Sequence, residues 1–306
     1  MHATIDEALA DDADIDLVVV ASANRAHVSN ARAAIAAGKH VVVDKPLAGT
    51  AAQAQALAAQ ADAAGVQLHT FQNRRWDSDF LTLASVLSSG AIGTPHRVES
   101  RFERLRVEPK GGWRESSDPM DLGGVLLDFG AHLVDQALML LGPVSAVDAY
   151  ARSLRNPGAG DDDMMIVLTH VSGAVSLLVG SQVSAFAVPR FTALGTRGGL
   201  RIGPSDSQEE RLRAGSSPGA ADWGVEAFDA ELVTGDADGR LAVRAVPMIP
   251  GDWPRFYAQV GAAISAGSAG PVPITDVIAN LRVLEAAARS SASRARIRLD
   301  PPASHA

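Results

Sequence analysis

The sequence predicts an α/β protein in which a parallel sheet wrapped by helices is followed by an α+β domain with an open, mostly antiparallel sheet. Strand and helix patterns alternate over residues 16–71, which is typical of a parallel sheet. After residue 93, strand patterns follow one another with few helices between them, which is typical of antiparallel pairing. The chain has 306 residues and is 47% hydrophobic, enough for one or two sizeable cores. We therefore expect two domains, 1–92 and 93–306.

The first domain contains two short β-branched runs without alternation, as expected for strands that are buried on both faces, and a third strand pattern follows them. Helices separate these strands, and glycines end two of the helices. Thr4 and Glu7 form the pattern of a capping box at the first helix. In order, the predicted elements are a helix over Thr4–Asp11, a strand over Asp16–Ser22, a helix over Asn24–Ala37, a strand over His40–Asp44, a helix over Thr50–Ala64 and a strand over Val66–Phe71.

The carboxyl ends of these three strands carry polar and cationic residues. Ligands of open parallel sheets bind beyond such ends. The segments concerned are 21–24, 44–46 and 72–76. We therefore expect a binding site at this edge of the sheet.

The second domain is predicted to be an antiparallel meander with helices at its beginning and end. Residues 203–238 are polar and rich in glycine, so we expect a long excursion there. A helix predicted over Asp77–Ser88 still belongs to the first domain. The predicted elements of the second domain are strands over His96–Arg106, Val144–Arg152, Asp163–Val171, Ala174–Val183, Arg190–Gly195 and Leu200–Ile202, helices over Trp253–Gly267 and Ile274–Ser290, and a short strand over Ala295–Asp300 before a tail that contains proline.

The segment from Gly123 to Gly142 places ionisable groups inside a strongly apolar helix, where they are costly. If the helix starts near Asp128, then Asp128, His132 and Asp135 share one face at i, i+4 and i+7. A carboxylate one turn away could hold the imidazole in one tautomer and bring its pKa toward neutral pH, as proton transfer requires. The alternative is a core helix with a capping aspartate and a satisfied histidine. The two preceding glycines allow a close approach of the backbone.

The composition argues against several classes of function. The net charge is −8 and no block of Lys and Arg stands out, so nucleic acid and membrane surfaces are poor candidates for partners. The absence of cysteine excludes disulfides and thiolate metal sites, and we expect no metal. No apolar run approaches the roughly 18 residues of a membrane span, and the N-terminus has no signal-peptide pattern. We therefore expect a cytoplasmic protein.

A nucleotide-binding domain of this type normally begins with a strand, a G-x-G-x-x-G turn and a helix. The sequence contains no such turn, and the nearest glycine cluster, residues 158–163, lacks both the third glycine and the strand-to-helix context. We therefore expect a partial, N-truncated Rossmann domain, and an isolated chain that binds NAD(P)H weakly.

Three motifs in the right order resemble the Gfo/Idh/MocA group of NAD(P)-dependent oxidoreductases. Residues 23–27 are similar to its Pro-Asn-x-x-His turn, residues 44–46 to its Glu-Lys-Pro motif with Asp44 in place of Glu, and residues 123–132 to its catalytic helix. The resemblance covers essentially the whole chain. Stretches at residues 73–82, 113–115, 133–136, 208–215 and 222–224 resemble the branch that contains bacterial NADP-dependent scyllo-inositol 2-dehydrogenases.

The resemblance implies hydride transfer between NAD(P), with NADP favoured, and a CH–OH group of a cyclic polyol or sugar. Such chemistry needs a base near neutral pKa and a cation beside the developing alkoxide. The resemblance assigns these roles to His132 and Lys45, with Asp128 completing the catalytic group. The alternative is a truncated, inactive relative that binds a polyol or serves as a partner subunit.

The resemblance also implies residues for each ligand. The implied cofactor-binding residues are Ser22, Asn24, His27, Asp44, Lys45, Asn73 and Arg74, and the implied substrate-binding residues are Lys45, Arg114, Asp128 and His132. Some roles stay open from the sequence. Asn24 could instead cap a helix, and Arg74 could bind substrate or phosphate or pair with Asp77 or Asp79. Trp113, Arg114 and Trp223 could line a sugar pocket or only pack.

The family also implies assembly into a homodimer or a homotetramer built from dimers. In the sequence, residues 174–179 of the predicted meander are apolar on both faces, which favours cover by another subunit.

Overall fold

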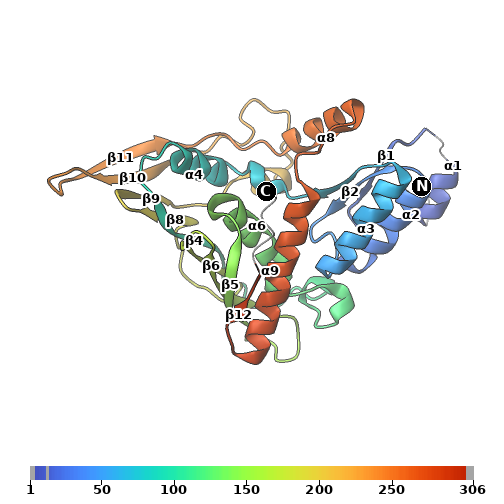
Figure 1. The fold of residues 1–306 in the computed structure, drawn as a ribbon, viewed down its shortest axis with the longest axis horizontal. Helices are drawn as coiled ribbons and strands as arrows, with labels where there is room; N and C mark the ends of the chain where they lie inside the picture. The colour runs from blue at the N-terminus through green and yellow to red at the C-terminus, as the bar shows by residue number, and fades with distance from the viewer. Residues whose placement is uncertain (1–3, 12–13, 301–306) are drawn as a thin grey trace.

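The first sheet is parallel, as the alternation of patterns predicts (Figure 1). The computed structural model describes residues 4–11 and 14–300. In this part of the chain, the first sheet consists of β1 (Leu17–Val20), β2 (His40–Asp44) and β3 (Leu68–Phe71), in that order. Val41, Val42 and Val43 of the central strand are fully buried, because helices cover both faces of the sheet.

Helices precede and connect these strands, so that the carboxyl ends of the strands lie at one edge of the sheet. The helices are α1 (Ile5–Asp11), η1 (Asn24–Ala26), α2 (His27–Ala36) and α3 (Ala51–Ala64). The α3 helix begins where the side chain of Thr50 accepts a hydrogen bond from the backbone N–H of Gln53, at 3.2 Å. It ends at Gly65, whose φ of 67° lies in the left-handed region.

The second sheet is mixed and has nine strands in the described residues, in the order β11-β10-β9-β8-β4-β7-β6-β5-β12. These strands are β4 (Pro95–Glu103), β5 (Val144–Arg152), β6 (Asp163–His170), β7 (Val175–Ser181), β8 (Phe191–Gly195), β9 (Gly198–Ile202), β10 (Asp229–Gly235), β11 (Leu241–Pro247) and β12 (Ile297–Arg298). The prediction of a simple meander was wrong in one respect, because β4 lies between β7 and β8 and runs parallel to β7. Strand patterns identify strands but not their partners, and this pairing joins segments about 80 residues apart.

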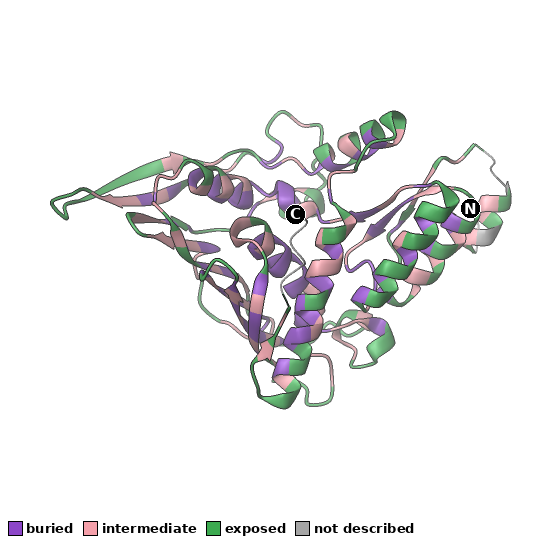
Figure 2. Cartoon of the chain, viewed as in Figure 1, coloured by how far each residue is buried: buried purple, intermediate pink, exposed green. Residues whose placement is uncertain are grey.

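The prediction of an irregular excursion over residues 203–238 was also wrong. This region contains α7 (Gln208–Arg213) and β10, and β10 pairs with both β9 and β11. The β10–β11 hairpin extends from the body of the protein, and β11 is exposed along most of its length (Figure 2). An exposed edge strand lacks the buried apolar pattern by which strands are recognised in a sequence.

Two long helices cover one face of the second sheet, α6 (Gly130–Leu141) and α9 (Ile274–Ser293). Leu133 of α6 and Leu284 of α9 pack with Leu168 and Leu178 of the sheet in a buried core. On the opposite face, Tyr150 and Met165 are 58% and 41% exposed. The sheet therefore has one face in the core and one that carries large exposed side chains.

Two helices pack on the sheet that lies on the other side of the expected boundary at residue 92. The helix α4 (Ser78–Ser88) precedes residue 92, yet its Phe80 and Leu83 pack in the core of the second sheet. The helix α8 (Pro254–Ala266) follows residue 92, yet its Phe256 and Val260 pack in the core of the parallel sheet. The strands of the two sheets therefore lie on opposite sides of residue 92 in the sequence, but α4 and α8 pack across this boundary. The division into domains 1–92 and 93–306 stays a prediction.

Within residues 4–11 and 14–300, no single helix is long and apolar enough to cross a membrane. One pair of helical segments, Pro119–Asp128 and Gly130–Leu141, has the length and composition only when taken together, and the pair is bent by 54°. The shorter helical elements of this region are η3 (Trp113–Glu115), η4 (Pro119–Asp121) and α5 (Val125–Asp128).

Candidate active site

Two glycines and one aspartate fix the start of α5, which carries Asp128. A Cβ atom on Gly123 would lie 2.6 Å from the carbonyl oxygen of Trp113, and one on Gly124 would lie 2.2 Å from Oδ1 of Asp161. Gly124 also has a φ of 89°, which side chains rarely adopt. The backbone N–H of Leu126 donates to Oδ2 of Asp161 at 2.7 Å. The close approach that the sequence predicts for this glycine pair is confirmed.

Lys45 joins the parallel sheet to α5. It follows β2 and precedes Pro46, and the peptide bond between them is cis. Its Nζ donates to Oδ1 of Asp128 at 2.5 Å and to the backbone carbonyl of Asp128 at 2.7 Å. Burial raises the pKa of Asp128, but the attraction of Lys45 more than offsets this effect and leaves the pKa below its ordinary value. The carboxyl group of Asp128 is therefore ionised at neutral pH.

His132 lies in the first turn of α6, in the same hollow as Lys45 and Asp128. Its Nδ1 is buried and has no hydrogen-bond partner in the described part of the chain. Burial, followed by the positive charges of Lys45, Arg74 and Arg190, lowers the pKa of His132 well below its ordinary value. The ring is therefore neutral at physiological pH and can accept a proton.

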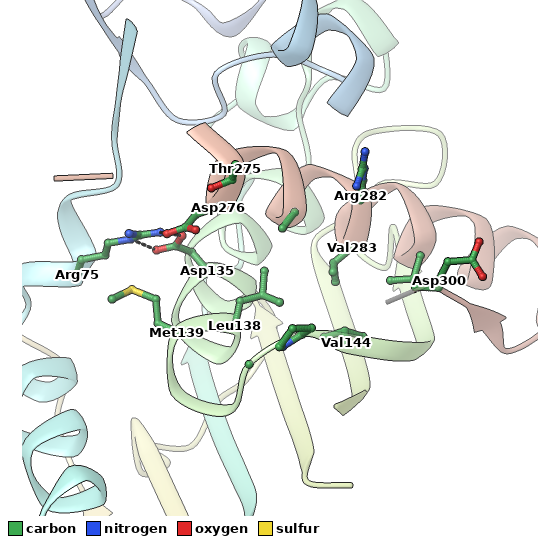
Figure 3. A pocket seen from close by; sticks show the side chains of 14 residues that line it. Arg75, Asp135, Leu138, Met139, Val144, Thr275, Asp276, Arg282, Val283 and Asp300 are labelled. Atoms are coloured by element: carbon green, nitrogen blue, oxygen red, sulfur yellow. Dashed lines mark hydrogen bonds and ion pairs between the residues drawn. The ribbon is translucent and has the colours of Figure 1, made fainter. Parts of the chain in front are cut away.

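Asp135 does not orient His132, so this part of the sequence prediction was wrong. Its carboxylate accepts two hydrogen bonds from Arg75, at 2.8 and 2.6 Å. Figure 3 shows this pair at one end of a second pocket, together with Asp276 and with Leu138 and other side chains of α6 and α9. The spacing i, i+4, i+7 assumes one continuous helix, whereas Asp128 ends α5 and a bend precedes α6.

A smaller hollow of about 260 Å³ lies at the carboxyl ends of β1 and β2. It contains five of the seven residues expected to bind cofactor, namely Ser22, Asn24, His27, Asp44 and Lys45. Burial raises the pKa of Asp44, and the positive charges near it, from His27, Lys45 and Arg114, offset this only in part. The smaller hollow shares Asp44, Lys45, Arg114 and Asp128 with the larger one, which has a volume of about 740 Å³.

Asn24 and His27 make specific contacts around the smaller hollow. Asn24 does not cap a helix, since its Nδ2 donates to the carbonyl oxygen of Leu122 at 3.2 Å. The ring of His27 is fully buried, with Nδ1 2.8 Å from the carbonyl oxygen of Pro46 and Nε2 3.1 Å from that of Ser22. His27 therefore ties the loop after β1 to the turn after β2.

Asn73 and Arg74 line the larger hollow and not the smaller one. Arg74 forms the ion pair that the sequence left as an alternative, because its Nη1 donates to Oδ2 of Asp77 at 3.1 Å. Its Nη2 donates to Glu209 at 2.8 Å. This arginine is thus already neutralised by two carboxylates.

The sequence left open whether Trp113, Arg114 and Trp223 line a pocket or only pack. The structure decides this for each of them. Arg114 lines both hollows, and Trp113 lines the smaller one. Trp223 is buried in the core of the parallel unit, and its Nε1 donates to Oε1 of Gln208 at 2.8 Å. Trp223 is a packing residue.

Sequence reasoning missed much of the lining of the larger hollow. The missed residues are Phe71, Phe102, Glu103, Arg104, Arg106, Lys110, Phe129, Ser205, Asp206, Glu209, Glu210, Arg213 and Trp253. Several of them come from segments that follow β4 and β9, far from the recognised motifs. Five basic residues spread over 101–114, with two glutamates among them, are the signal in the sequence that could have pointed there.

The fold and the site together define a class of protein. A polar hollow at the strand ends of a parallel α/β unit is where a nucleotide binds. A second hollow adjoins it, and a lysine, an aspartate and a neutral histidine lie in this second hollow. This is the arrangement of a two-domain oxidoreductase that holds a nicotinamide cofactor beside its substrate.

Comparison with known proteins identifies the family. A family model described as an oxidoreductase family with an NAD-binding Rossmann fold matches residues 2–72, and the model of the GFO/IDH/MocA C-terminal domain matches residues 80–201. This chain belongs to the GFO/IDH/MocA family of NAD(P)-dependent oxidoreductases.

The similarity extends along nearly the whole chain. It is 37% identical to the uncharacterized oxidoreductase YdgJ of Escherichia coli, over 94% of this chain and 82% of that protein. It is 32% identical to the NADP-dependent scyllo-inositol 2-dehydrogenase IolW of Bacillus subtilis, over 96% of this chain and 82% of that protein. The solved structure of YvaA from Bacillus subtilis matches with a TM-score of 0.91 and 31% identity, over 97% of this chain and 84% of that one.

Proposed function

We propose that this protein catalyses reversible hydride transfer between NADP and a secondary alcohol of a cyclic polyol or sugar. One observation carries the proposal. Lys45 from the parallel unit bonds to Asp128 of α5 where the two hollows meet, and His132 lies in the larger hollow with them. The substrate specificity of IolW and the motifs of its branch support a polyol such as scyllo-inositol.

Each of these residues has a role in the proposed reaction. When bound, NADP would supply the nicotinamide that takes up the hydride from the carbinol carbon. Lys45 donates a hydrogen bond to the substrate oxygen and stabilises the negative charge that develops on it. His132 takes the hydroxyl proton, so that a carbonyl group forms. Asp128 orients Lys45 through the bond of 2.5 Å.

The residues around the smaller hollow fit the nicotinamide end of the cofactor. Ser22, Asn24 and Asp44 supply polar groups at the strand ends, where such cofactors bind. Buried Thr70 Oγ1 and Gln72 Oε1, at and just beyond the end of β3, have no partner in the described residues. We propose that His27 supports this site through its two backbone contacts, and that Asn73 and Arg74 border it from the larger hollow. Preference for NADP over NAD rests on the resemblance and on the name of IolW.

The test is a panel of substrates. The purified protein is assayed for reduction of NADP and of NAD with scyllo-inositol, myo-inositol and neutral hexoses, by absorbance at the wavelength of the reduced cofactor. We expect turnover of at least one cyclic polyol or sugar and faster turnover with NADP. Absence of turnover with every polyol and sugar, in both directions, would overturn the proposal.

We also propose that the protein assembles into a homodimer, or into a tetramer of dimers, through the outer face of the nine-stranded sheet. Tyr150, Met165, Val167, Leu177 and Val179 lie on neighbouring strands with their side chains on this face. Exposed apolar side chains grouped on one face mark an interaction surface. A cytoplasmic location stays a prediction of the sequence.

A further inference from the structure

Three basic residues on one segment line the larger hollow. Arg104, Arg106 and Lys110 follow β4, and they belong to the larger hollow but not to the smaller one at the strand ends. Within residues 4–11 and 14–300, none of the three has an ion-pair partner within 4 Å. The side chain of Arg106 donates a hydrogen bond to the side-chain oxygen of Gln182, at 3.3 Å. The chain as a whole carries a net charge of −8, so a group of cations without carboxylate partners is unexpected in its cleft.

Most of the other cations of this hollow are paired with carboxylates. Lys45 bonds to Asp128, Arg74 bonds to Asp77 and Glu209, and Arg213 also bonds to Glu209. Of the other acidic residues in the lining, Glu103 pairs with Arg101, Asp206 accepts hydrogen bonds from the backbone N–H groups of Ser78 and Gln208, and Glu210 is exposed on α7. The guanidinium of Arg114 lies over the ring of Trp113 and has no ion-pair partner within the residues that the structure describes. The cations of this hollow without carboxylate partners are therefore Arg104, Arg106, Lys110 and Arg114, and the first three lie on the segment that follows β4.

Arg104 is held close to the catalytic helices. Its guanidinium lies over the ring of Phe129, 5.2 Å from the ring centroid, and Phe129 follows Asp128 directly. Burial, followed by the positive charge of Arg106, lowers the pKa of Arg104. Two neighbouring arginines repel one another, and an anion close to both of them offsets this repulsion. An acidic group of a ligand in this hollow would therefore be attracted by both guanidinium groups.

The basic segment does not border the hollow in which we expect the cofactor, so a phosphate of the cofactor is not the ligand that we infer for it. The cofactor-side hollow is bordered by Ser22, Asn24 and His27 at the ends of the parallel strands. Arg104, Arg106 and Lys110 lie in the larger hollow with His132, on the substrate side of the Lys45–Asp128 pair. The positive charge of these three residues can therefore distinguish between neutral and negatively charged substrates.

We propose that the natural substrate is an anionic sugar or polyol, whose carboxylate or phosphate group is bound by Arg104 with Arg106 and Lys110. The inference rests on the proposed function, because the hydroxyl that is oxidised must lie at Lys45 and His132 while the acidic group reaches the basic segment. Arginine binds both carboxylate and phosphate through paired hydrogen bonds, so the shared chemistry is a negatively charged oxyacid group.

Kinetics with matched substrates test the inference. D-glucose is compared with D-glucuronate and D-glucose 6-phosphate, and myo-inositol with myo-inositol 1-phosphate, all with NADP. We expect kcat/KM for at least one anionic member to exceed that of its neutral parent tenfold or more. Preference for the glucuronate assigns a carboxylate, and preference for the phosphate esters assigns a phosphate.

Variants then locate the anion. Arg104→Gln should raise KM for the preferred anionic substrate about tenfold or more and should lower the preference in kcat/KM for this substrate over its neutral parent by a similar factor, while Arg104→Lys should retain part of the preference. Arg240→Gln, on the exposed turn of the β10–β11 hairpin, is the matched control and should change neither. Turnover of neutral sugars without preference for anions, or equal effects of Arg104→Gln on both, would overturn this inference and leave the proposed function standing. Absence of turnover with any sugar, charged or neutral, would overturn the proposed function and this inference with it.

Discussion

Arg75 and Asp135 form a buried ion pair with two hydrogen bonds, of 2.8 and 2.6 Å, and their side chains are only 6% and 3% exposed. Arg75 follows β3 of the parallel unit, whereas Asp135 lies on α6 one turn beyond His132. Asp276 of α9 also pairs with Arg75, at 3.1 Å (Figure 3). This pair fixes the helix that carries His132 against the parallel unit.

Removing the carboxylate of Asp135 should destabilise the protein. Asp135→Asn leaves the positive charge of Arg75 buried with only the partial compensation of Asp276, and loss of one partner of a buried pair costs about 3–5 kcal/mol. Urea unfolding at pH 7 measures the change in the free energy of unfolding. Asp148→Asn is the control, because Asp148 is 41% exposed and its contact with Arg296 is 3.7 Å long. Equal stability of Asp135→Asn and the wild type would contradict the assigned role.

Loss of either reacting group should abolish most of the activity. We expect Lys45→Ala and His132→Ala each to lower kcat about a hundredfold or more, the usual scale for a lost proton-transfer or alkoxide-stabilising group. The measurement is steady-state reduction of NADP with the best substrate of the panel, with circular dichroism as a check on folding. His96→Ala, an exposed histidine of β4, should retain wild-type rates. Near-wild-type turnover in either Lys45→Ala or His132→Ala would exclude the mechanism.

The pH dependence of His132 follows from its surroundings. Burial and then the charge of Lys45 lower its pKa, so the ring is unprotonated through neutral pH and gains a proton only well below its ordinary range. Because the unfolded chain binds this proton at a higher pH than the folded one, the contribution of His132 to stability is lost as the pH falls below about 6.5. NMR titration of the ring measures the midpoint.

The same titration isolates the effect of Lys45. Lys45→Met removes a positive charge beside His132, so the midpoint of His132 should rise toward its ordinary value. His170, whose pKa is lowered by burial and whose ring contacts Gly142 and Ser176, is the internal control, and its midpoint should stay unchanged. An unchanged midpoint of His132 in Lys45→Met would show that Lys45 does not act on the ring.

A methyl group at Gly124 should disturb the site more than one at a glycine in open space. In Gly124→Ala, the new Cβ meets Oδ1 of Asp161 at 2.2 Å, so α5 and Asp128 must shift. Gly158 has a similar positive φ, of 94°, and no atom within 4 Å of its would-be Cβ. Both variants place a side chain at a positive φ, so both bear the same kind of backbone strain. We therefore expect the activity of Gly124→Ala to be at least tenfold lower than that of Gly158→Ala, and this difference measures the effect of the close contact. Equal activities would show that the contact does not position Asp128.

A charge on the outer face of the nine-stranded sheet should dissociate the assembly. Leu177→Arg places a cation at the centre of this face, beside Val167 of β6. We expect light scattering at micromolar concentration to show a dimer or tetramer for the wild type and a smaller species for the variant. Met120→Asp, on the exposed η4 turn, should leave the assembly intact. A monomeric wild type would contradict the proposed assembly.

The sequence by itself determined the elements whose cause is local. The strand His40–Asp44 was predicted with its observed bounds, because a β-branched run without polar interruption is typical of a buried strand. The α3 helix followed from Thr50 as its cap and Gly65 as its end. The family followed from three short motifs, which also contain Lys45, Asp128 and His132.

Only the tertiary structure decided which of these groups meet. Lys45 and Asp128 are 83 residues apart, and Arg75 and Asp135 are 60 apart. Helical spacing placed Asp135 with His132, but a bend before α6 and the charge of Arg75 gave it another partner. Spacing along one element constrains neighbours on that element alone, whereas an ion pair forms wherever folding removes two opposite charges from water together. For the same reason, only the folded chain shows that the basic segment with Arg104, Arg106 and Lys110 lines the substrate hollow.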